Sequence, residues 1–504
     1  MPSTIPELLT VAQEEAIAIA APERVTLSYA RLRQHVTGTA NTLRRVGISR
    51  RDRVAIVATN GPEMATAVLS VMTAAVAAPL NPAYRPEEFD FYFSDLGVKA
   101  LIVEAGFDTA AVAVAQARGI VIVELVHRRE EPAGLFRLQG ASGDPADAEP
   151  AQGTDVALLL HTSGTTSRPK LAPLSHQNLC ASARNIAATL SLSATDRCMN
   201  VMPLFHIHGI AAGLLAPLAS GGSVLCTPGF NALKFFGWMN EARPTWYTAV
   251  PTMHQAVLAR AARNQEVIKR ARLKFIRSSS AALPPKVLAE LEEVFAAPVI
   301  EAYAMTEAAH QITSNPLPPR VREPGSVGLP AGPEVVVLDP AGHLLSPGET
   351  GEVAIRGDNV MRGYEKNPEA NAAAFSDGWF RTGDQGVFDA DGYLRITGRL
   401  KEIINRGGEK ISPREVDEVL LEHPAIAVAV TFALPHDKLG EDVAAAVVLR
   451  EGELADEQEL RNFVSARLAN FKVPRRIVFA SEIPTGPTGK LQRIGLAHRL
   501  GLAP

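Results

Sequence analysis

The sequence predicts an α/β fold with two domains, a large N-terminal domain over residues 1–398 and a small α+β domain over residues 399–504. The chain has 504 residues, which is more than a single hydrophobic core supports. Strand and helix patterns alternate through the first 150 residues, and the pattern changes again near residues 320 and 398. We therefore expect layered α/β subdomains first, a β-rich subdomain next, and a compact C-terminal domain last.

The first part of the N-terminal domain shows this alternation. Apolar residues at helical spacing predict a helix over 32–46, and a short apolar run predicts a strand over 53–57. A second helix over 63–75 and a second strand over 100–103 follow. Strands that alternate with helices are typical of parallel α/β layers. The polar, turn-rich residues 128–154 are expected to form a loop.

The last third of the chain has a different texture. Short β-like runs at 335–338 and 352–355, separated by glycine and proline, predict a β-rich subdomain. We place the domain boundary at 398–401, because about a hundred residues of α+β pattern follow it, which is enough for a domain. The elements expected there are a helix over 413–423, strands over 426–432 and 443–449, a helix over 456–470 and a strand over 476–479.

Composition excludes several classes of protein. Hydrophobic content of 46% with 21% charged residues is ordinary for a soluble globular protein. The net charge of −4 leaves no basic footprint for nucleic acid, and no apolar run reaches the roughly 20 residues of a membrane span. Three cysteines without metal-like spacing and an N-terminus without a signal peptide predict a cytoplasmic protein. No pattern indicates an oligomeric state.

The most informative segment is HTSGTTSRPK at 161–170, which follows a buried-strand pattern at 156–160. Hydroxyls, backbone N–H groups and a glycine that allows close approach can wrap a polyphosphate. Its spacing does not fit a Walker A loop. Alone, such a run is equally a surface turn. Its candidate phosphate-binding residues are Thr162, Ser163, Gly164, Thr165, Thr166 and Lys170.

Four further segments accompany this loop: EAYAMTE at 301–307, WFRTGD at 379–384, GRLKEIINRGGEKI at 398–411 and PTGPTGK at 484–490. In this order the five segments resemble the adenylate-forming acyl-CoA synthetase superfamily, which includes firefly luciferase, coumarate ligases and peptide-synthetase adenylation domains. The resemblance covers essentially the whole chain. It implies an enzyme that joins an acid to ATP as an acyl-adenylate, releases pyrophosphate and transfers the acyl group to CoA.

The resemblance also implies catalytic residues. The first step brings two anions together, so positive charge must be supplied where charge develops. Lys490 is implied to bridge the acid carboxylate and the α-phosphate of ATP. Thr306 and Glu307 are implied to contact the α-phosphate and Mg²⁺, for which Glu307 supplies a hard oxygen ligand. His206 stands where the family has a gating residue.

The nucleoside is implied to bind at the second and third segments. Adenine is expected to lie against the face of Tyr303, and Asp384 and Arg399 are expected to hold the ribose. Taken singly, Tyr303 is better explained as a core aromatic and Asp384 as a turn residue, and only the five segments together favour the functional reading. The full implied set is Ser280, Ala281, Ala282, Glu301, Ala302, Tyr303, Asp384 and Arg399.

The small domain is implied to be mobile. Lys401 stands where the family has a hinge, about which the C-terminal domain swings between an adenylating and a thioester-forming pose. In the second pose Gly407 and Gly408 would leave a channel for the pantetheine arm of CoA, and Lys410 would approach AMP. An ordinary tight turn is an alternative reading of the two glycines, and it does not exclude this role.

The acid is predicted from the residues that would line its pocket. Hydroxyls and imidazoles at Ser279, Ser280, His206 and His310 suit a second carboxylate, because they donate hydrogen bonds and a histidine, if protonated, adds a compensating charge. The residues 301–318 and the Ser167-Arg168 spelling of the loop look like plant and fungal oxalate–CoA ligases. In those enzymes the pocket serine and the histidine after the Thr-Glu pair hold the distal carboxylate.

Oxalate is therefore the predicted acid, and other readings stay open. The same pattern fits a ligase for malonate or for medium- or long-chain fatty acids. An adenylation protein that loads a carrier thiol is a further class, and a non-enzymatic nucleotide-binding protein is another, against which Lys490 argues. His206 and His208 also resemble a metal pair, although the sequence shows no third ligand.

Overall fold

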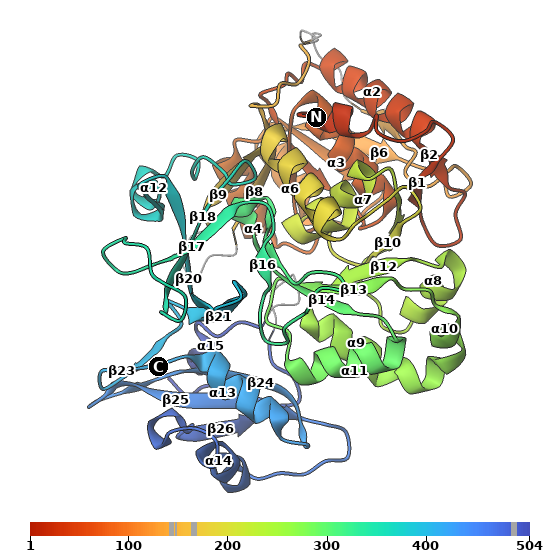
Figure 1. Cartoon of the computed structure of the whole chain (residues 1–504). Coiled ribbons are helices and arrows are strands. Elements are labelled where there is room, and N and C mark those ends of the chain that lie inside the picture. Colours follow the sequence, from red (N-terminus) through yellow and green to blue (C-terminus); the bar gives the residue numbers. More distant parts are fainter. Residues whose placement is uncertain (141–145, 147–148, 163–168, 485–490, 504) are drawn as a thin grey trace.

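The computed structural model describes residues 1–140, 146, 149–162, 169–484 and 491–503 (Figure 1). Two large sheets with their helices form the first part of the chain. A smaller antiparallel sheet follows, and a compact α+β unit, drawn in blue, ends the chain (Figure 1). The predicted fold class, a large N-terminal α/β domain with a smaller C-terminal domain, is confirmed.

The first sheet has seven strands with a parallel centre. Residues 54–57 of β3 are fully buried, because helices cover both faces of a central parallel strand. Antiparallel pairs close both edges of this sheet. In spatial order its strands are β7 (Arg137–Gln139), β6 (Val121–Val126), β5 (Ala100–Glu104), β3 (Arg53–Val57), β4 (Val76–Pro79), β8 (Val156–His161) and β9 (Leu171–Ser175).

The second sheet has nine strands and is parallel from β1 to β14. After β14 the chain turns through η3 (Thr306–Ala308) and returns antiparallel as β15. The carboxyl ends of β13 and β14 lie side by side, where α/β sheets bind ligands. In spatial order the strands are β16 (Leu329–Pro330), β15 (His310–Ser314), β14 (Val299–Met305), β13 (Phe275–Ser279), β12 (Trp246–Ala249), β10 (Arg197–Asn200), β11 (Ser223–Cys226), β1 (Ile17–Ala20) and β2 (Leu27–Ser28).

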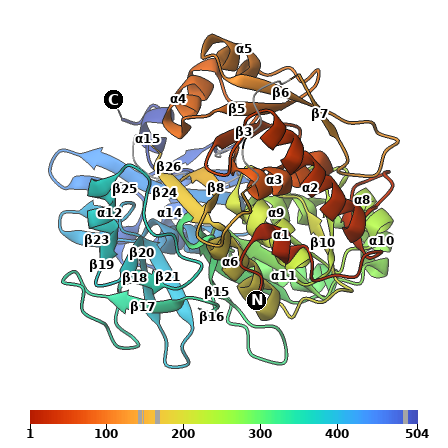
Figure 2. The ribbon, with the colours of Figure 1, turned by 90° about the horizontal axis from the view of Figure 1, so that it is seen from above.

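Helices form three layers around these sheets. The middle layer shares one hydrophobic core with both sheets. It contains α1 (Ile5–Leu8), α2 (Tyr29–Arg45), α3 (Pro62–Ala74), α6 (His176–Thr189), the π-helix η1 (His208–Leu215) and α7 (Ala216–Ala219). The outer face of the first sheet carries α4 (Pro86–Leu96) and α5 (Ala110–Ala117), which lie together in Figure 2. The outer face of the second carries α8 (Phe235–Ala242), α9 (Pro251–Ala261), η2 (Ala262–Asn264), α10 (Gln265–Arg270) and α11 (Pro285–Phe295).

The β-rich subdomain predicted after residue 320 is an antiparallel sheet. Its strands are β17 (Glu334–Leu338), β18 (Gly351–Arg356), β19 (Phe375–Ser376), β20 (Trp379–Phe388) and β21 (Leu394–Arg399), and α12 (Pro368–Ala374) precedes β19. β20 pairs with both β18 and β21. Asp384 and Arg399 therefore lie opposite each other on the neighbouring strands β20 and β21.

The C-terminal unit has its own hydrophobic cores. Its sheet contains β22 (Ile404–Arg406), β23 (Glu409–Ile411), β24 (Ile426–His436), β25 (Gly440–Leu449) and β26 (Arg476–Phe479). One core packs α13 (Pro413–Glu422) and α14 (Glu457–Ser465) on this sheet, and the other packs α15 (Leu496–Arg499) on it. A 3-10 turn, η4 (Asn470–Lys472), leads into β26.

Most predicted elements lie where the sequence put them, with two corrections. The helix predicted over 456–470 ends at Ser465, because the backbone turns extended at Ala469 before η4 begins. The region 128–154, predicted as loop, contains the short edge strand β7. The domain boundary at 398–401 stays a prediction; β21 ends at Arg399 and β22 begins at Ile404.

Two further features of the described residues concern the surroundings of the fold. Cys180, Cys198 and Cys226 are buried free thiols. Among the described residues, no helix has both the length and the apolar character that crossing a bilayer requires.

Candidate active site

Three of the residues predicted to bind the nucleoside meet in one hydrogen-bonded group. The Tyr303 hydroxyl donates to Asp384 Oδ2 at 2.5 Å, and Arg399 Nε donates to Asp384 Oδ1 at 2.8 Å. Asp384 is 4% exposed, and its negative charge raises the pKa of the Arg399 guanidinium. The three residues come from β14, β20 and β21, so this group joins the second sheet to the β-rich sheet.

The predicted nucleoside-binding residues Ser280, Ala281 and Ala282 follow β13. Ala281 and Ala282 are exposed just beyond the carboxyl end of that strand. Ala302 is buried, and its carbonyl accepts a hydrogen bond from the Ser279 hydroxyl at 2.8 Å. The Glu301 carboxylate is also buried, and it accepts the backbone N–H of Leu283 at 3.0 Å. The Glu301 side chain thus holds the 280–283 turn in place, rather than facing an open site.

The phosphate end gathers around Tyr364. Its hydroxyl donates to Glu307 Oε1 at 2.8 Å, and Lys170 Nζ lies 4.5 Å from its ring centroid. Burial lowers the pKa of Lys170, as does the positive charge of Lys401, while Glu307 raises it. Lys170, Lys401 and Glu307 therefore lie close enough to influence one another, and Thr306 precedes Glu307 in η3.

Glu307 fits a magnesium ligand. Its carboxylate is 7% exposed, and burial raises its pKa although the Tyr364 hydroxyl opposes that shift. In the part of the chain that the structure describes, no three His, Cys, Asp or Glu residues gather as a protein-built metal cage. Mg²⁺ is usually held by one or two carboxylates together with substrate phosphates, so a single carboxylate beside a phosphate site suits it.

Part of the phosphate loop and the implied catalytic lysine lie outside the described residues. They are Ser163, Gly164, Thr165, Thr166 and Lys490. The loop's described ends are joined, because the Thr162 N–H donates to the Lys170 carbonyl at 2.8 Å. The strand pair β8–β9 thus fixes the base of the loop.

The acid end is a buried polar cluster. His208 Nδ1 lies 3.0 Å from Ser280 Oγ, and His208 Nε2 lies 2.6 Å from Thr248 Oγ1. The rings of His208 and His310 stack with centroids 4.8 Å apart. His310 Nε2 lies 3.1 Å from Nη1 of Arg277, which is fully buried. Four elements, η1, β12, β13 and β15, and the turn after β13, which carries Ser280, supply these side chains.

The backbone of this cluster is strained. Ser280 has φ of 74° and His310 has φ of 105°, a region that non-glycine residues rarely adopt. Such residues cost on the order of 1–3 kcal/mol each and gather at ligand sites. η1, which begins at His208, is a π-helix, another feature frequent at functional sites.

The structure adds a histidine to the predicted pocket residues. His208 lies in the buried cluster, and the Nδ1 atom of the half-buried His206 accepts the backbone N–H of His208 at 3.3 Å. The Ser279 hydroxyl donates a hydrogen bond to the Ala302 carbonyl, whereas the Ser280 hydroxyl lies beside His208. A single sequence shows a His-x-His pair, but it does not show which ring turns inward.

The predicted CoA loop forms a tight hairpin. Gly407 and Gly408 join β22 to β23 with φ of 59° and 100°, as a two-residue turn with positive φ requires. A Cβ at Gly408 would meet nothing within 4 Å, so its open side is free for a ligand to approach. Lys410 is exposed on β23. No contact links these residues to Tyr303, Asp384 or Arg399 in the described part of the chain.

Sequence reasoning missed Tyr364, His208 and Arg277 as members of the site. Tyr364 sits in no chemical motif, and only its contacts with Glu307 and Lys170 reveal it. Arg277 had one signal, since an arginine inside an otherwise buried strand is unusual.

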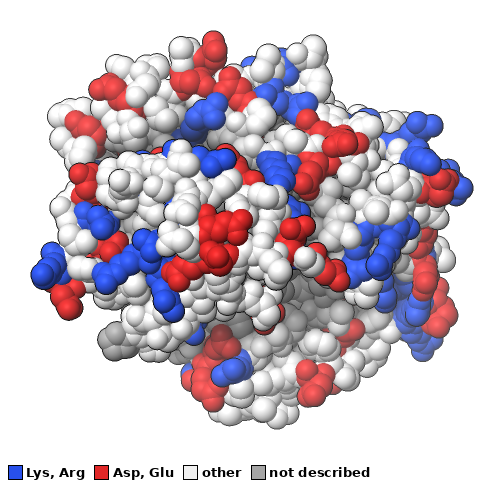
Figure 3. Space-filling view, turned by 90° about the horizontal axis from the view of Figure 1, so that it is seen from below, with Lys and Arg blue, Asp and Glu red and all other residues white. Residues whose placement is uncertain are grey.

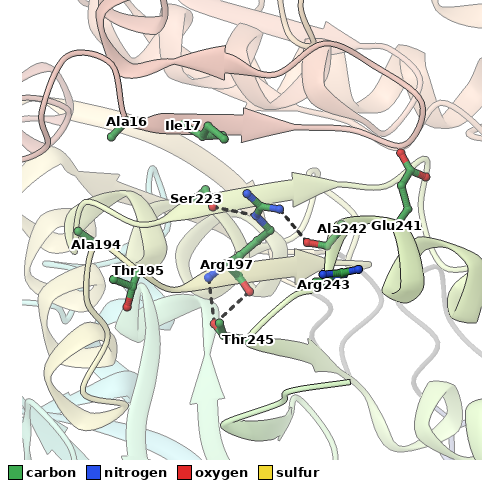
Figure 4. A pocket seen from close by; sticks show the side chains of 10 residues that line it. All are labelled: Ala16, Ile17, Ala194, Thr195, Arg197, Ser223, Glu241, Ala242, Arg243 and Thr245. Atoms are coloured by element: carbon green, nitrogen blue, oxygen red, sulfur yellow. Dashed lines mark hydrogen bonds between the residues drawn. The ribbon is translucent and has the colours of Figure 1, made fainter. Parts of the chain in front are cut away.

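Two surface hollows lie away from these residues. One, of about 520 Å³, opens beside β1, β10 and β11, where Arg197 Nη1 donates to the Ala242 carbonyl at 2.7 Å (Figure 4). The other, of about 630 Å³, lies over the N-terminus of α3 and the β11–α8 connection. None of the predicted site residues lines either hollow. On the face seen from below, acidic and basic side chains are mixed in small groups (Figure 3).

Comparisons with known proteins agree with this arrangement. A family model for AMP-binding enzymes matches residues 10–365, and a model for the C-terminal domain of AMP-binding enzymes matches residues 415–490. An oxalate–CoA ligase of Arabidopsis thaliana is 45% identical, with 94% of each chain covered. An oxalate–CoA ligase of Saccharomyces cerevisiae is 42% identical, covering 97% of this chain and 95% of its own. The ATP-bound structure of MatB from Rhodopseudomonas palustris superposes with a TM-score of 0.88 at 30% identity, covering 98% of this chain and 97% of that one.

Proposed function

Because this chain belongs to the AMP-binding enzyme family and is an AMP-forming acyl-CoA synthetase, we propose that the acid it activates is oxalate. ATP, Mg²⁺ and CoA are the other reactants of such an enzyme. The products would be oxalyl-CoA, AMP and pyrophosphate. The two oxalate–CoA ligases that this chain resembles over nearly their whole length support this choice.

The observation that carries the proposal is the polar cluster at the acid end. His208, His310 and Arg277 are each at most 1% exposed, and Ser280 is the member that reaches the surface of the cluster. Buried polar groups are costly unless they are paired, so a pocket for an alkyl chain would not be lined this way. The polar side chains of this cluster favour an acid with a second carboxylate over an alkyl chain.

The reaction would proceed in two steps. In the first, one oxalate oxygen forms a bond to the α-phosphorus of ATP, and the bond to pyrophosphate breaks. In the second, the thiolate sulfur of CoA attacks the acyl carbon, and AMP leaves with the electron pair of the acyl–oxygen bond. Asp384, Arg399 and Tyr303 would hold the nucleoside throughout, because they are already bound to one another in one group.

The phosphates would bind at the opposite end of that group. Glu307 would hold Mg²⁺, which neutralises phosphate charge, and Tyr364 orients this carboxylate through its hydroxyl. Lys170 and the loop that it closes would hold the departing pyrophosphate. Lys490 would bridge the oxalate carboxylate and the α-phosphate in the first step, and Thr306 would contact the same phosphate.

The C-terminal domain, taken as residues 399–504, would swing between the two steps about Lys401. Lys490 would leave the site in the second pose, and the Gly407–Gly408 turn would admit pantetheine, with Lys410 approaching AMP. The open side of Gly408 and the exposed position of Lys410 support this part of the proposal. The cytoplasmic location and His206 as a gating residue belong to the same proposal and rest on the sequence.

CoA-dependent AMP release across a panel of acids tests the substrate. The panel contains oxalate, malonate, acetate, octanoate, palmitate and a cinnamate at equal concentration. We expect kcat/KM for oxalate to exceed that for every other acid by at least about tenfold, since an unfilled polar site penalises acids without a second carboxylate. Faster turnover of palmitate or malonate than of oxalate would reject the proposal, and AMP formation without any CoA requirement would point to a carrier-loading enzyme.

A further inference from the structure

Among the described residues, no carboxylate forms an ion pair with the buried cation Arg277. It lies in the middle of β13, between β12 and β14, and none of its surface is exposed. No ion pair with a carboxylate forms at Arg277 within the described residues, and its Nε has no hydrogen-bond partner there. Burial lowers its pKa only to about 10, so the guanidinium keeps its charge at neutral pH. A buried unpaired charge is strongly unfavourable, which indicates that a ligand supplies the missing negative charge.

The contact between Arg277 and His310 fixes the proton on the imidazole. A guanidinium can only donate hydrogen bonds, so at 3.1 Å from Arg277 Nη1 the Nε2 atom of His310 must accept. The proton of the neutral ring is then on Nδ1. A doubly protonated ring would set two N–H donors against each other beside a positive charge. His310 therefore acts as a neutral donor, which corrects the expectation that a protonated histidine balances the acid.

The other groups packed around this pair leave Arg277 as the fixed charge among them. His208 from η1 stacks on His310, and Gln311 Oε1 accepts from Arg277 Nη2 at 3.4 Å. Burial raises the pKa of Cys198 on β10, which stays a thiol. Burial lowers the pKa of His254 on α9 to about 3, so that ring stays neutral.

We propose that Arg277 is the positioning residue for the acid: it holds His310 in the Nδ1–H form and supplies the positive charge that balances the distal carboxylate. This inference rests on the proposed function for the identity of the acid. It predicts that the affinity for the oxalate dianion does not change with pH across the neutral range, because neither Arg277 nor His310 gains or loses a proton there.

The wild-type enzyme gives the first test. The KM for oxalate should stay within about twofold between about pH 6 and 8, a range that spans the ordinary histidine pKa of about 6.5. The KM for ATP, measured in the same buffers, corrects for effects on the nucleotide end. A tenfold rise in the KM for oxalate through this range would show that a histidine proton carries the charge, and it would overturn the proposal without any variant.

The variant Arg277→Met gives the second test. It should raise the KM for oxalate by about 30- to 100-fold at pH 8, as loss of a buried charge-assisted interaction does, and change the KM for ATP by less than about threefold. His310, released from the guanidinium, can then take a second proton. The KM for oxalate should therefore fall again as the pH is lowered toward 6, a reversal that a merely structural loss would not produce.

Two further variants keep the test decisive. Arg197→Met, in strand β10 of the same sheet, removes a partly buried arginine that belongs to the remote hollow, and it should leave both KM values unchanged. His310→Gln keeps an acceptor for Arg277 and a neutral donor, and it should keep a KM for oxalate that does not depend on pH. If the wild type turns over oxalate and Arg277→Met leaves its KM unchanged, the inference fails alone. If the wild type does not use oxalate, the proposed function fails first.

Discussion

The nucleotide end and the acid end of the site are built in opposite ways. At the nucleotide end, Asp384 pairs with Arg399, whose side chain is 41% exposed, and Tyr303 links this pair to the second sheet. At the acid end, Arg277 is fully buried within one sheet, and its hydrogen-bond partners among the described residues are His310 and Gln311, neither of which carries a negative charge. The first end has its charges balanced before any ligand arrives, whereas the second lacks one negative charge.

This difference suggests that the nucleotide end binds ATP, whereas the acid end determines which acid is accepted. Because the charges of Asp384 and Arg399 already balance each other, this pair does not need a ligand charge for its own stability. The nucleotide end therefore positions ATP, which every AMP-forming ligase uses. A buried unbalanced cation discriminates, because an acid without a second carboxylate leaves it unpaired. Variants at the two ends should therefore change different kinetic constants, and the predictions below run from the largest expected effect to the smallest.

Lys490→Ala should cause the largest loss, because neither end alone supplies the charge between the two anions. We expect the rate of adenylation, measured as oxalate-dependent exchange of pyrophosphate into ATP, to fall by about 10³-fold, as for loss of a transition-state donor. Thioester formation from supplied oxalyl-adenylate should fall by less than about tenfold. Lys472→Ala, whose ammonium pairs with Glu415 at 2.7 Å inside the C-terminal domain, is the control. Equal losses in both half-reactions would contradict the two-pose proposal.

Asp384→Asn should break the nucleotide end while sparing the acid end. The amide removes the charge that Arg399 faces at 2.8 Å and puts N–H donors where Tyr303 and Arg399 need an acceptor. We expect the KM for ATP to rise by about 100-fold and the KM for oxalate to change by less than about threefold, from the cost of a lost charged hydrogen bond. Glu334→Gln, which removes an exposed ion pair in the same sheet, should change neither. A matching rise in both KM values would mean that the two ends are not separate.

Tyr364→Phe should shift the pH dependence of the nucleotide end. The Tyr364 hydroxyl lowers the pKa of Glu307, and burial raises it. Without the hydroxyl the pKa rises, so the carboxylate that would hold Mg²⁺ is lost at a higher pH on acidification. We expect the acid limb of kcat/KM for ATP to move to higher pH and the activity at pH 8 to fall by about threefold or less. Tyr393→Phe, whose hydroxyl donates to the Val321 carbonyl, is the matched control. An acid limb that stays in place would exclude Glu307 as the titrating group.

The two ends also differ in how far the sequence predicted them. At the nucleotide end, Tyr303, Asp384, Arg399 and Glu307 each stand in a motif of fixed spelling, and three of the four lie in one hydrogen-bonded group. The chemistry of those motifs is carried by residues close together in the chain, so their spacing is visible. The alternation of strands and helices was likewise visible, and β3 and β26 lie at the predicted residues.

The acid end depends on contacts between distant residues, which a single sequence does not display. His208, Ser280 and His310 meet from segments at least thirty residues apart in the chain, and the backbone angles of Ser280 and His310 are ones that no local pattern predicts. The choice between His206 and His208 depends on which ring the π-helix turns inward. The proposed charge of the pocket depends on Arg277, whose place in a buried strand is unusual, but only the structure shows which groups surround it.

Glu301→Gln should leave both ends active and change only stability. Glu301 lies on β14 beneath the turn that separates the two ends, and burial raises its pKa from the ordinary 4.5 to about 7. The folded protein therefore holds a proton that the unfolded chain releases. The contribution of Glu301 to the free energy of unfolding is complete below about pH 4.5 and is lost as the pH rises through about 7. One pKa unit corresponds to about 1.4 kcal/mol, so this group should cost about 3 kcal/mol of the free energy of unfolding by pH 8. Denaturant unfolding at pH 5 and pH 8 should show a smaller difference for Glu301→Gln than for the wild type, with kcat within about twofold. The same difference in both proteins would mean that Glu301 does not titrate in this range, and that the turn between the two ends is held by its backbone alone.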